Sequence, residues 1–385
     1  MIPYGRQDIS QSDIDAVVQV LKSDFLTQGP QVPLFEDTVS KYCGAEYAVA
    51  VNSATSALHI ACLAIGLKKG DRLWTSPNSY VASANCGLYC GASVDFVDID
   101  ISTCNLSDEI LEKKLIQAKA DKLLPKVVIP VHFSGQSCNM EKIYALSLEY
   151  GFRIIEDASH AIGGQYLNHK IGSCQYSDIT IFSFHPVKII TTAEGGMATT
   201  NNADLLEKMQ LLRSHGVTRD GGLMTKATEG DWYYQQVALG FNFRMNELQA
   251  ALGVSQISRL DEFVIKRNLL RQRYDSMLEG FPVTPLCQTE GNYSAVHLYP
   301  IILNSQELNV SRKQVFEYLR NCQIYVNVHY IPIHTQPYYQ KMGFGIGDFP
   351  NSEAYYESAI TLPLFASMTF QQQDEVVSAL REVLR

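Results

Sequence analysis

Short apolar segments alternate with amphipathic segments through the larger, N-terminal part of the chain. We expect buried strands at residues 47–53, 94–99, 126–133, 152–157, 178–184 and 196–200. Helical periodicity falls between them, for example at 56–67 and 139–151. This alternation is typical of a mostly parallel sheet with helices on both faces. The pattern therefore predicts an α/β fold with a large sheet domain.

Further along, the period of the pattern changes. From Asn246 to about Leu278 apolar residues recur near every 3.6 positions, which predicts one long helix leading out of the sheet domain. After Gly280, the runs "AVHLYPIIL" and "YVNVHYIPI" indicate strands of a smaller α+β domain. We place the boundary between a large domain, 1–250, and a small C-terminal domain, 251–385. Residues 218–232, rich in Gly, Thr and charge, are expected to form a long mobile loop.

Composition narrows the function classes. The chain has 385 residues and a formal charge of −9, with no long Lys/Arg run, so neither nucleic acid nor an anionic membrane is expected as the main partner. No stretch approaches the roughly 18 apolar residues of a spanning helix, and we expect a cytoplasmic protein. Nine cysteines are scattered without a C-x-x-C pair. They are expected to be small buried hydrophobes rather than disulfides or metal ligands, and no metal site is predicted.

Ligands of open α/β sheets bind beyond the carboxyl ends of the strands, so the residues that follow each strand are candidates for chemistry. The first such stretch is "VNSATSALHIA", where Ser53, Thr55 and Ser56 open a helix. Free amides and hydroxyls at a helix N-terminus can bind a phosphate. Serine and threonine are also ordinary N-caps, so both interpretations stay open.

A second strand ends in "FRIIEDASHA". Glu156 and Asp157 leave an apolar strand there, and His160 follows three residues after Asp157. The carboxylate could cap the next helix, or it could hold a proton on the ring nitrogen of a cofactor. His160 could equally be a hydrogen-bonded core histidine.

The third end is "FSFHPVKIITTAEGG", which carries the single lysine Lys188 after Pro186 and closes on Gly195 and Gly196. Partial burial lowers the pKa of an amine, and the neutral amine is the form that attacks an aldehyde to give an imine. The two glycines are expected to let the backbone approach something flat. In "SPNSYVASAN", Tyr80 could stack on a ring or simply fill the core. Together, a phosphate site, a carboxylate and this lysine, in this order on one sheet, describe a pyridoxal phosphate (PLP) site.

The residues that carry these signals also carry a family resemblance. The motifs "NSATSALH", "EDASHA", "FSFHPVKIITTAEGG", "GFNFRMNELQAALG" and "VHYIPIH" resemble the DegT/DnrJ/EryC1/StrS family of sugar aminotransferases over almost the whole chain. The resemblance implies the aspartate-aminotransferase type of fold with PLP as cofactor. It makes Lys188 the catalytic lysine and Asp157 the partner of the pyridine nitrogen. The other cofactor contacts that it implies are Ala54, Thr55, Tyr80, His160, Ser183 and Asn242.

The same resemblance implies the partners. Asn242 matches an asparagine that reaches the cofactor phosphate of a neighbouring subunit, so a homodimer is expected. The implied reaction moves the amino group of L-glutamate to C4 of a UDP-linked 4-keto-6-deoxy sugar. The sugar contacts implied are Tyr4, Arg213, His215, Asn327, His329 and Tyr330, each of which could instead be a structural hydrogen-bonding residue.

Other functions stay open on the sequence. A UDP- or dTDP-linked keto sugar of another kind would fit the same motifs. Related dehydratases lack the lysine, so Lys188 argues against that activity. A non-catalytic regulator on the same scaffold would have little reason to keep Asp157 and Lys188 together, and no DNA-binding element is appended.

Overall fold

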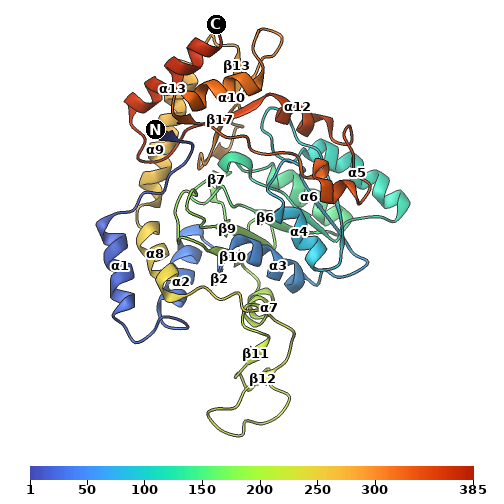
Figure 1. The fold of residues 1–385 in the computed structure, drawn as a ribbon. Coiled ribbons are helices and arrows are strands. Elements are labelled where there is room, and N and C mark those ends of the chain that lie inside the picture. The colour runs from blue at the N-terminus through green and yellow to red at the C-terminus, as the bar shows by residue number, and fades with distance from the viewer.

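The computed structural model describes residues 1–385. Its centre is a seven-stranded sheet in the order β2-β10-β9-β6-β5-β3-β4 (Figure 1). Only β10 runs antiparallel to its neighbours, so the predicted α/β class is confirmed. The strands are β2 Tyr47–Val51, β3 Arg72–Thr75, β4 Ser93–Phe96, β5 Val127–Ile129, β6 Arg153–Asp157, β9 Ile179–Ser183 and β10 Gly196–Thr200.

Helices cover both faces of this sheet because its central strands are apolar on both sides. Phe182 and Met197 pack in one core cluster with α2 and α8, whereas Ile181 and Ala198 pack in another with α3 and α7. This alternation follows the two-residue period of a strand. The helices of the large domain are α1 Gln11–Leu21, α2 Gln31–Cys43, α3 Ala54–Ile65, α4 Ala82–Tyr89, α5 Asp108–Asp121, α6 Met140–Tyr150, α7 Ala203–Arg213 and α8 Glu247–Ile257.

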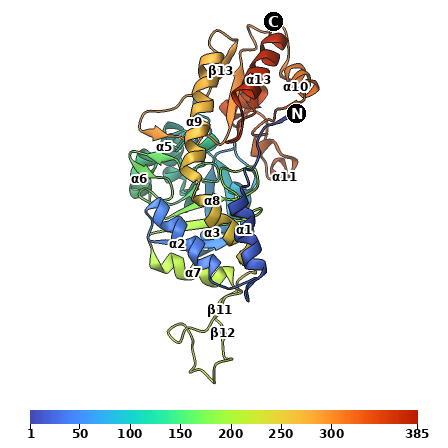
Figure 2. The same cartoon turned by 90° about the vertical axis from the view of Figure 1, so that its left-hand side faces the viewer.

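The predicted helix over 246–278 is wrong in one respect, because it is two helices. α8 ends at Ile257, and α9 (Leu260–Met277) begins after a break at Ser258 and Arg259. Arg259 leaves helical geometry, and its guanidinium bonds Asp8 at 2.8 Å and Asp13 at 2.7 Å. Apolar periodicity continues through the break, so only these long-range ion pairs reveal it. Figure 2 shows α9 rising from the large domain to the small one.

The small domain is built on the sheet β13-β15-β17. Its elements are β13 Val283–Pro285, β15 Tyr299–Leu303, β16 Ile324–Tyr325, β17 Ala359–Leu362, α10 Arg312–Asn321, α11 Pro337–Gln340, α12 Pro350–Ser358 and α13 Phe370–Val383. The strand expected over "YVNVHYIPI" is wrong beyond Tyr325. There the chain is irregular, apart from one bridge between Asn327 and Thr361.

Strand pairing crosses the expected boundary between residues 250 and 251 twice. β1 (Ile2–Pro3) pairs with β16, so the N-terminus lies with the small domain. β14 (Asn292–Tyr293) joins β7 (Gln165–Tyr166) and β8 (His169–Lys170) of the large one. The division into two domains remains a prediction, and these two strand pairs join the domains across the expected boundary.

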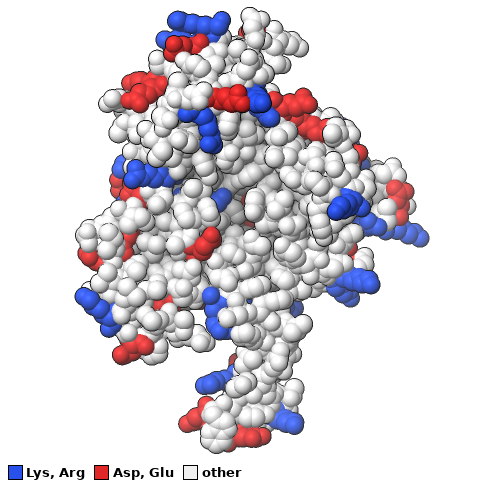
Figure 3. All heavy atoms as spheres, viewed as in Figure 1, with Lys and Arg blue, Asp and Glu red and all other residues white.

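The loop expected at 218–232 belongs to an arm. β11 (Val217–Thr218) and β12 (Gln235–Gln236) pair at its base, and the segment between them projects from the body (Figures 1 and 2). Trp232 and Tyr234 on this arm are exposed. None of the helices combines the length and apolar character that crossing a bilayer requires. Positive and negative side chains are interspersed over the face in Figure 3, and neither sign gathers there.

Candidate active site

Lys188 lies in the short connection between β9 and β10. The turn closes locally, with the Lys188 amide donating to the His185 carbonyl at 2.9 Å and Thr192 donating to Phe184 at 3.0 Å. Burial of the amine lowers the pKa of Lys188 to about 8, although the nearby Asp157 carboxylate acts in the opposite direction. A substantial fraction of this lysine is therefore the neutral, nucleophilic amine near neutral pH.

The two glycines after Lys188 lie in close contact with other parts of the chain. A Cβ on Gly196 would lie 2.5 Å from the backbone nitrogen of Ala54, and one on Gly195 would meet Thr192 and Met245. Gly196 lets the start of β10 lie against the start of α3, because only a residue without a side chain fits there. That the two glycines also let the backbone approach a flat ligand remains a prediction.

That contact adjoins the predicted anion site. Ser53 caps α3, and its hydroxyl accepts from the Ser56 amide. The amides of Ala54 and Thr55, in the first turn, have no partner in the chain. Ser183 ends β9 opposite Gly196 and so lies on the same edge. Unpaired amides at a helix N-terminus bind phosphate, and these residues are those expected to do so.

Asp157 is buried at the carboxyl end of β6. It accepts the Ser83 hydroxyl at 2.6 Å and the Ser159 amide at 3.2 Å, and Ser79 bonds Ser83 at 2.8 Å. It does not cap a helix, because no helix follows it, so the capping interpretation is wrong. Ser79 and Ser83 could not be found from the sequence pattern, because Asp157, the partner of Ser83, lies 74 residues further along the chain.

Three buried histidines gather near Lys188. The rings of His160 and His297 are 4.5 Å apart, and burial together with the positive charge of Lys188 lowers the pKa of both imidazoles well below the usual value. The same causes lower the pKa of His329 to about 3. All three are therefore neutral at physiological pH. His297 was missed, although "AVHLYPIIL" places a histidine in an otherwise apolar run.

Residues of the small domain lie next to these histidines. The Tyr330 hydroxyl lies 3.1 Å from His160 Nε2, and Asn327 lies 3.3 Å from His329. The Tyr4 ring is 5.4 Å from the ring of His329. Tyr80, which is 64% exposed, has its ring 6.5 Å from that of Tyr330 and is not core filler. The structure thus brings together Tyr4, Tyr80, Asp157, His160, Lys188, Asn327, His329 and Tyr330.

Other expected site residues lie elsewhere in this chain. Arg213 bonds the Glu36 carboxylate and, at 2.8 Å, the Ala50 carbonyl, which is the structural alternative left open for it. His215 is exposed at the base of the arm. Asn242 is also exposed, between Phe241 and Phe243. Any contact that Arg213, His215 or Asn242 makes with a ligand remains a prediction.

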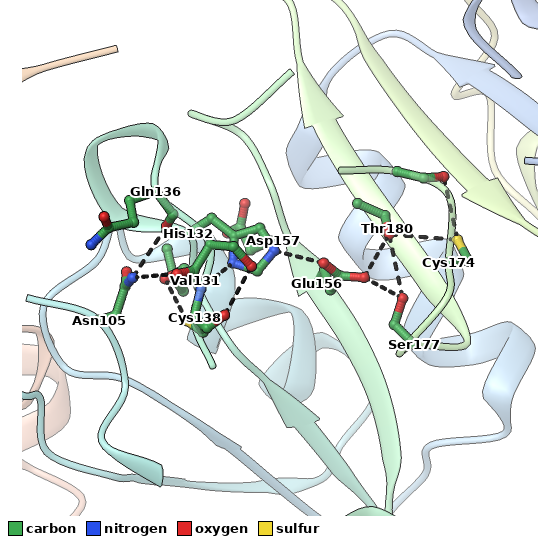
Figure 4. Close-up of polar contacts among 12 residues, drawn as sticks. Asn105, Val131, His132, Gln136, Cys138, Glu156, Asp157, Cys174, Ser177 and Thr180 are labelled. Carbon is green, nitrogen blue, oxygen red and sulfur yellow. Dashed lines mark hydrogen bonds and ion pairs between the residues drawn. The ribbon is translucent and has the colours of Figure 1, made fainter. Parts of the chain in front are cut away.

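A buried polar network surrounds Glu156, the residue before Asp157 in β6 (Figure 4). Glu156 accepts from Thr180 at 3.0 Å and from Ser177, and its other oxygen lies 2.6 Å from His132 Nε2. The Cys138 amide donates to His132 Nδ1 at 3.2 Å, so Nε2 holds the proton that faces Glu156. Burial opposes ionisation of Glu156, but these hydrogen bonds outweigh it and lower its pKa. The network ties the ends of β5, β6 and β9 together.

This donor set fits PLP. Unpaired amides suit its phosphate, the Asp157 carboxylate suits a protonated ring nitrogen, and the Lys188 amine suits its aldehyde. The two buried imidazole nitrogens without a partner, on His160 and His297, leave hydrogen-bonding capacity for a bound group. Fold and site together define a PLP-dependent enzyme.

Comparison with known proteins gives the particular family. The chain belongs to the DegT/DnrJ/EryC1/StrS aminotransferase family, whose model matches residues 7–381. It is therefore a PLP-dependent aminotransferase, and solved relatives include PLP and PMP forms.

Individual relatives cover the full chain. The spore coat polysaccharide biosynthesis protein SpsC of Bacillus subtilis is 37% identical over 100% of this chain and 97% of its own length. The UDP-4-amino-4,6-dideoxy-N-acetyl-beta-L-altrosamine transaminase of Campylobacter jejuni is 36% identical over 100% and 98%. The structure of Helicobacter pylori PseC, an aminotransferase of pseudaminic acid biosynthesis, matches with a TM-score of 0.90 at 31% identity, covering 100% and 99%.

Proposed function

We propose that the enzyme transfers the amino group of L-glutamate to C4 of a UDP-linked 4-keto-6-deoxy sugar. The substrate that we favour is UDP-2-acetamido-2,6-dideoxy-β-L-arabino-hexos-4-ulose, which is consumed in pseudaminic acid biosynthesis. The main observation behind this proposal is the half-buried amine of Lys188, whose pKa is lowered to about 8. Neutral histidines surround it. The names of the Campylobacter and Helicobacter relatives support the sugar.

Each residue has a defined task in this proposal. Bound PLP supplies the electron sink that stabilises negative charge at the carbon next to the transferred nitrogen. Lys188 Nζ takes the proton from the α-carbon of glutamate and, in the second half of the reaction, returns a proton to C4 of the sugar. Asp157 accepts a hydrogen bond from the ring nitrogen and keeps that nitrogen protonated. Ser83, which donates to Asp157 at 2.6 Å, holds the carboxylate in place.

The sugar pocket is proposed to lie on the small-domain side. Asn327 and His329 contact each other, and Thr361 Oγ1 lies 2.9 Å from His329 Nδ1. Neutral amide, imidazole and phenol groups can bond the hydroxyl and acetamido groups of a sugar without the cost of burying a charge. The rings of Tyr4 and Tyr330 each lie within ring-contact distance of His329.

We also propose a homodimer, in which Asn242 reaches the phosphate of the cofactor in the partner subunit. Asn242 is exposed, so its side chain is available for this role. The next residue, Phe243, accepts a backbone hydrogen bond of 2.8 Å from the Asn52 amide. A cytoplasmic location is part of the proposal, because nine free cysteines suit a reducing compartment.

The substrate assignment is tested with a panel of UDP- and dTDP-linked 4-keto sugars, L-glutamate and the holoenzyme, with products identified by mass spectrometry and NMR. We expect much faster conversion of the L-arabino sugar than of its D-xylo epimer at C5. Asn327→Ala should lower sugar turnover and leave the glutamate half-reaction nearly intact. Equal rates on both epimers, or amination at C3, would refute the assignment without touching the cofactor chemistry.

A further inference from the structure

One hydrogen bond joins the small-domain side of the site to His160. The Tyr330 hydroxyl lies 3.1 Å from His160 Nε2 and has no other hydrogen-bond partner in the chain. The second ring nitrogen of His160, Nδ1, is buried and has no partner. His160 follows Asp157, the last residue of β6, by three residues, so this free nitrogen lies at the edge of the sheet where PLP is expected.

Packing fixes the orientation of the His160 ring. The rings of His297, Phe133 and Tyr330 lie 4.5, 6.2 and 6.1 Å from it. Only 6% of His160 is exposed, so the ring has little room to turn. What packing leaves open is the tautomer, that is, which of the two nitrogens carries the single proton of the neutral imidazole.

The hydrogen bond distinguishes the two tautomers. If the Tyr330 hydroxyl donates to Nε2, only the Nδ1–H group of His160 is left without a partner. If Nε2–H donates instead, the hydroxyl proton of Tyr330 and the Nδ1 lone pair are both left without one. Because each buried polar group without a partner costs stability, the first arrangement is favoured. Burial raises the pKa of Tyr330, so its hydroxyl keeps the proton that it donates.

Asn78 anchors Tyr330 to the large domain. The side-chain oxygen of Asn78 accepts a hydrogen bond from the Tyr330 amide at 3.1 Å, and Asn78 is fully buried. Asn78 lies in the connection between β3 and α4, and Ser83 of α4 donates to Asp157 at 2.6 Å. One segment of the chain therefore positions both the carboxylate expected at the ring nitrogen and the tyrosine that bonds His160.

We propose that Tyr330, anchored by Asn78, is a positioning residue that holds His160 in the tautomer with its proton on Nδ1. The enzyme thereby presents a neutral N–H donor to bound PLP. The phenolic oxygen of PLP is attached next to the aldehyde carbon, so a donor near Lys188 can stabilise the negative charge on that oxygen. The inference rests on PLP as cofactor and not on which sugar or amino donor the enzyme uses.

The tautomer is measured by long-range ¹H–¹⁵N correlation NMR on the full chain labelled with ¹⁵N-histidine, before and after loading with PLP. The His160 signals are those absent from His160→Gln. We expect wild type to carry the proton on Nδ1 in both forms, and Tyr330→Phe to show both tautomers before loading. The control Tyr339→Phe removes the hydroxyl of another buried tyrosine, which bonds Asn85 at 2.6 Å, and it should keep the wild-type tautomer.

PLP release from the holoenzyme, followed by absorbance, connects the tautomer to the cofactor. Tyr330→Phe should release PLP several-fold faster than wild type, Asn78→Ala should show a smaller increase, and Tyr339→Phe should match wild type. A wild-type spectrum with the proton on Nε2 would overturn the inference even if every variant folds poorly. An unchanged tautomer in Tyr330→Phe would remove the role of that tyrosine. Unchanged release would remove its effect on PLP, and normal release from Asn78→Ala would remove the anchor.

Discussion

At the scale of single residues, the reactivity of the site depends on how far the protein removes Lys188 from water. Burial lowers the pKa of this amine from 10.5 to about 8, and the Asp157 carboxylate limits the change. At pH 7.5 the neutral fraction of the amine is then roughly 200-fold larger than for an unperturbed lysine. The residue is prepared for attack on an aldehyde before any ligand arrives.

This predicts the pH dependence of PLP capture. Because the neutral amine reacts, the rate at which apoenzyme takes up PLP should rise with pH, with a midpoint near 8, and level off above it. Stopped-flow absorbance from pH 6.5 to 10 measures the profile. Lys188→Arg is the control, because it keeps the charge but cannot supply a neutral amine. This variant should show no pH-dependent uptake of PLP. A wild-type rate that still climbs at pH 10 would contradict the lowered pKa.

At the same scale, Glu156 is ionised because its neighbours favour the charge. Its pKa is lowered below 4.5, so the stabilisation it provides is fully present above pH 4.5 and disappears as the pH falls through the folded-state value. The hydrogen bonds involved are charge-assisted, and such bonds are worth about 1.5–3 kcal/mol each.

Glu156→Gln should therefore lower the free energy of unfolding by about 2 kcal/mol at pH 7. The difference from wild type should stay constant down to about pH 5 and narrow below pH 4.5. Urea unfolding at a series of pH values gives this difference. Glu317→Gln, at an exposed ion pair 3.8 Å long, serves as control and should cost less than about 0.5 kcal/mol. A difference in unfolding free energy that stays unchanged down to pH 3 would argue against the ionisation assigned to Glu156.

At the scale of elements, the predicted anion site lies where β10 and α3 touch. Ala54 and Thr55 have unpaired amides only because they open a helix, and Gly196 lets the neighbouring strand end against that opening. The strand order places β10 between β2, which leads into α3, and β9, which leads to Lys188. One contact thus fixes the position of the predicted phosphate site relative to the lysine.

Gly196→Ala should disturb both stability and cofactor binding. The added methyl group meets backbone atoms 2.5 Å away, which cannot move aside as a side chain would. We expect a loss of about 1–3 kcal/mol in unfolding free energy and weaker PLP affinity, measured by urea unfolding of the apoenzyme and by PLP titration. Gly345→Ala, where nothing lies within 4 Å, should change neither. Normal PLP affinity in Gly196→Ala would remove this account of the anion site.

At the scale of the whole molecule, the proposed dimer decides where Asn242 acts. Asn242 is exposed, and the arm next to it carries the exposed Trp232 and Tyr234 away from the body. If Asn242 acts in the partner's site, a chain that lacks Lys188 and a chain that lacks Asn242 can complement each other. A heterodimer then contains one site with both residues intact.

Mixing inactive Lys188→Ala with Asn242→Ala chains should therefore restore activity, up to about half of the wild-type value per heterodimer. Turnover after subunit exchange measures the recovery, and mass spectrometry of the intact assembly verifies that exchange took place. A mixture of Lys188→Ala with Asp157→Asn is the control, because we propose that both residues act within one chain's site. Each site of that heterodimer lacks one of the two residues, so no activity should be restored. Well-exchanged Lys188→Ala and Asn242→Ala heterodimers without activity would show that Asn242 acts within its own chain.

Local pattern in the sequence determined the sheet and the order of its chemistry. Strands such as β6 and β9 are buried on both faces, so they appear as apolar runs. Asp157, which ends β6, and Lys188, in the connection that follows β9, are therefore found from the chain itself. A run of this kind depends on neighbouring residues only. The mostly parallel sheet and the pairing of lysine with carboxylate could therefore be predicted.

Tertiary structure decided the features that depend on partners far along the chain. Ser83 bonds Asp157, which lies 74 residues later in the chain, and Arg213 bonds Glu36, which lies 177 residues earlier. Helices α8 and α9 separate at Arg259, which pairs with Asp8, 251 residues earlier, while the apolar period continues through the break. Periodicity carries no information about such pairs, since burial and charge at one position depend on segments that only folding brings together.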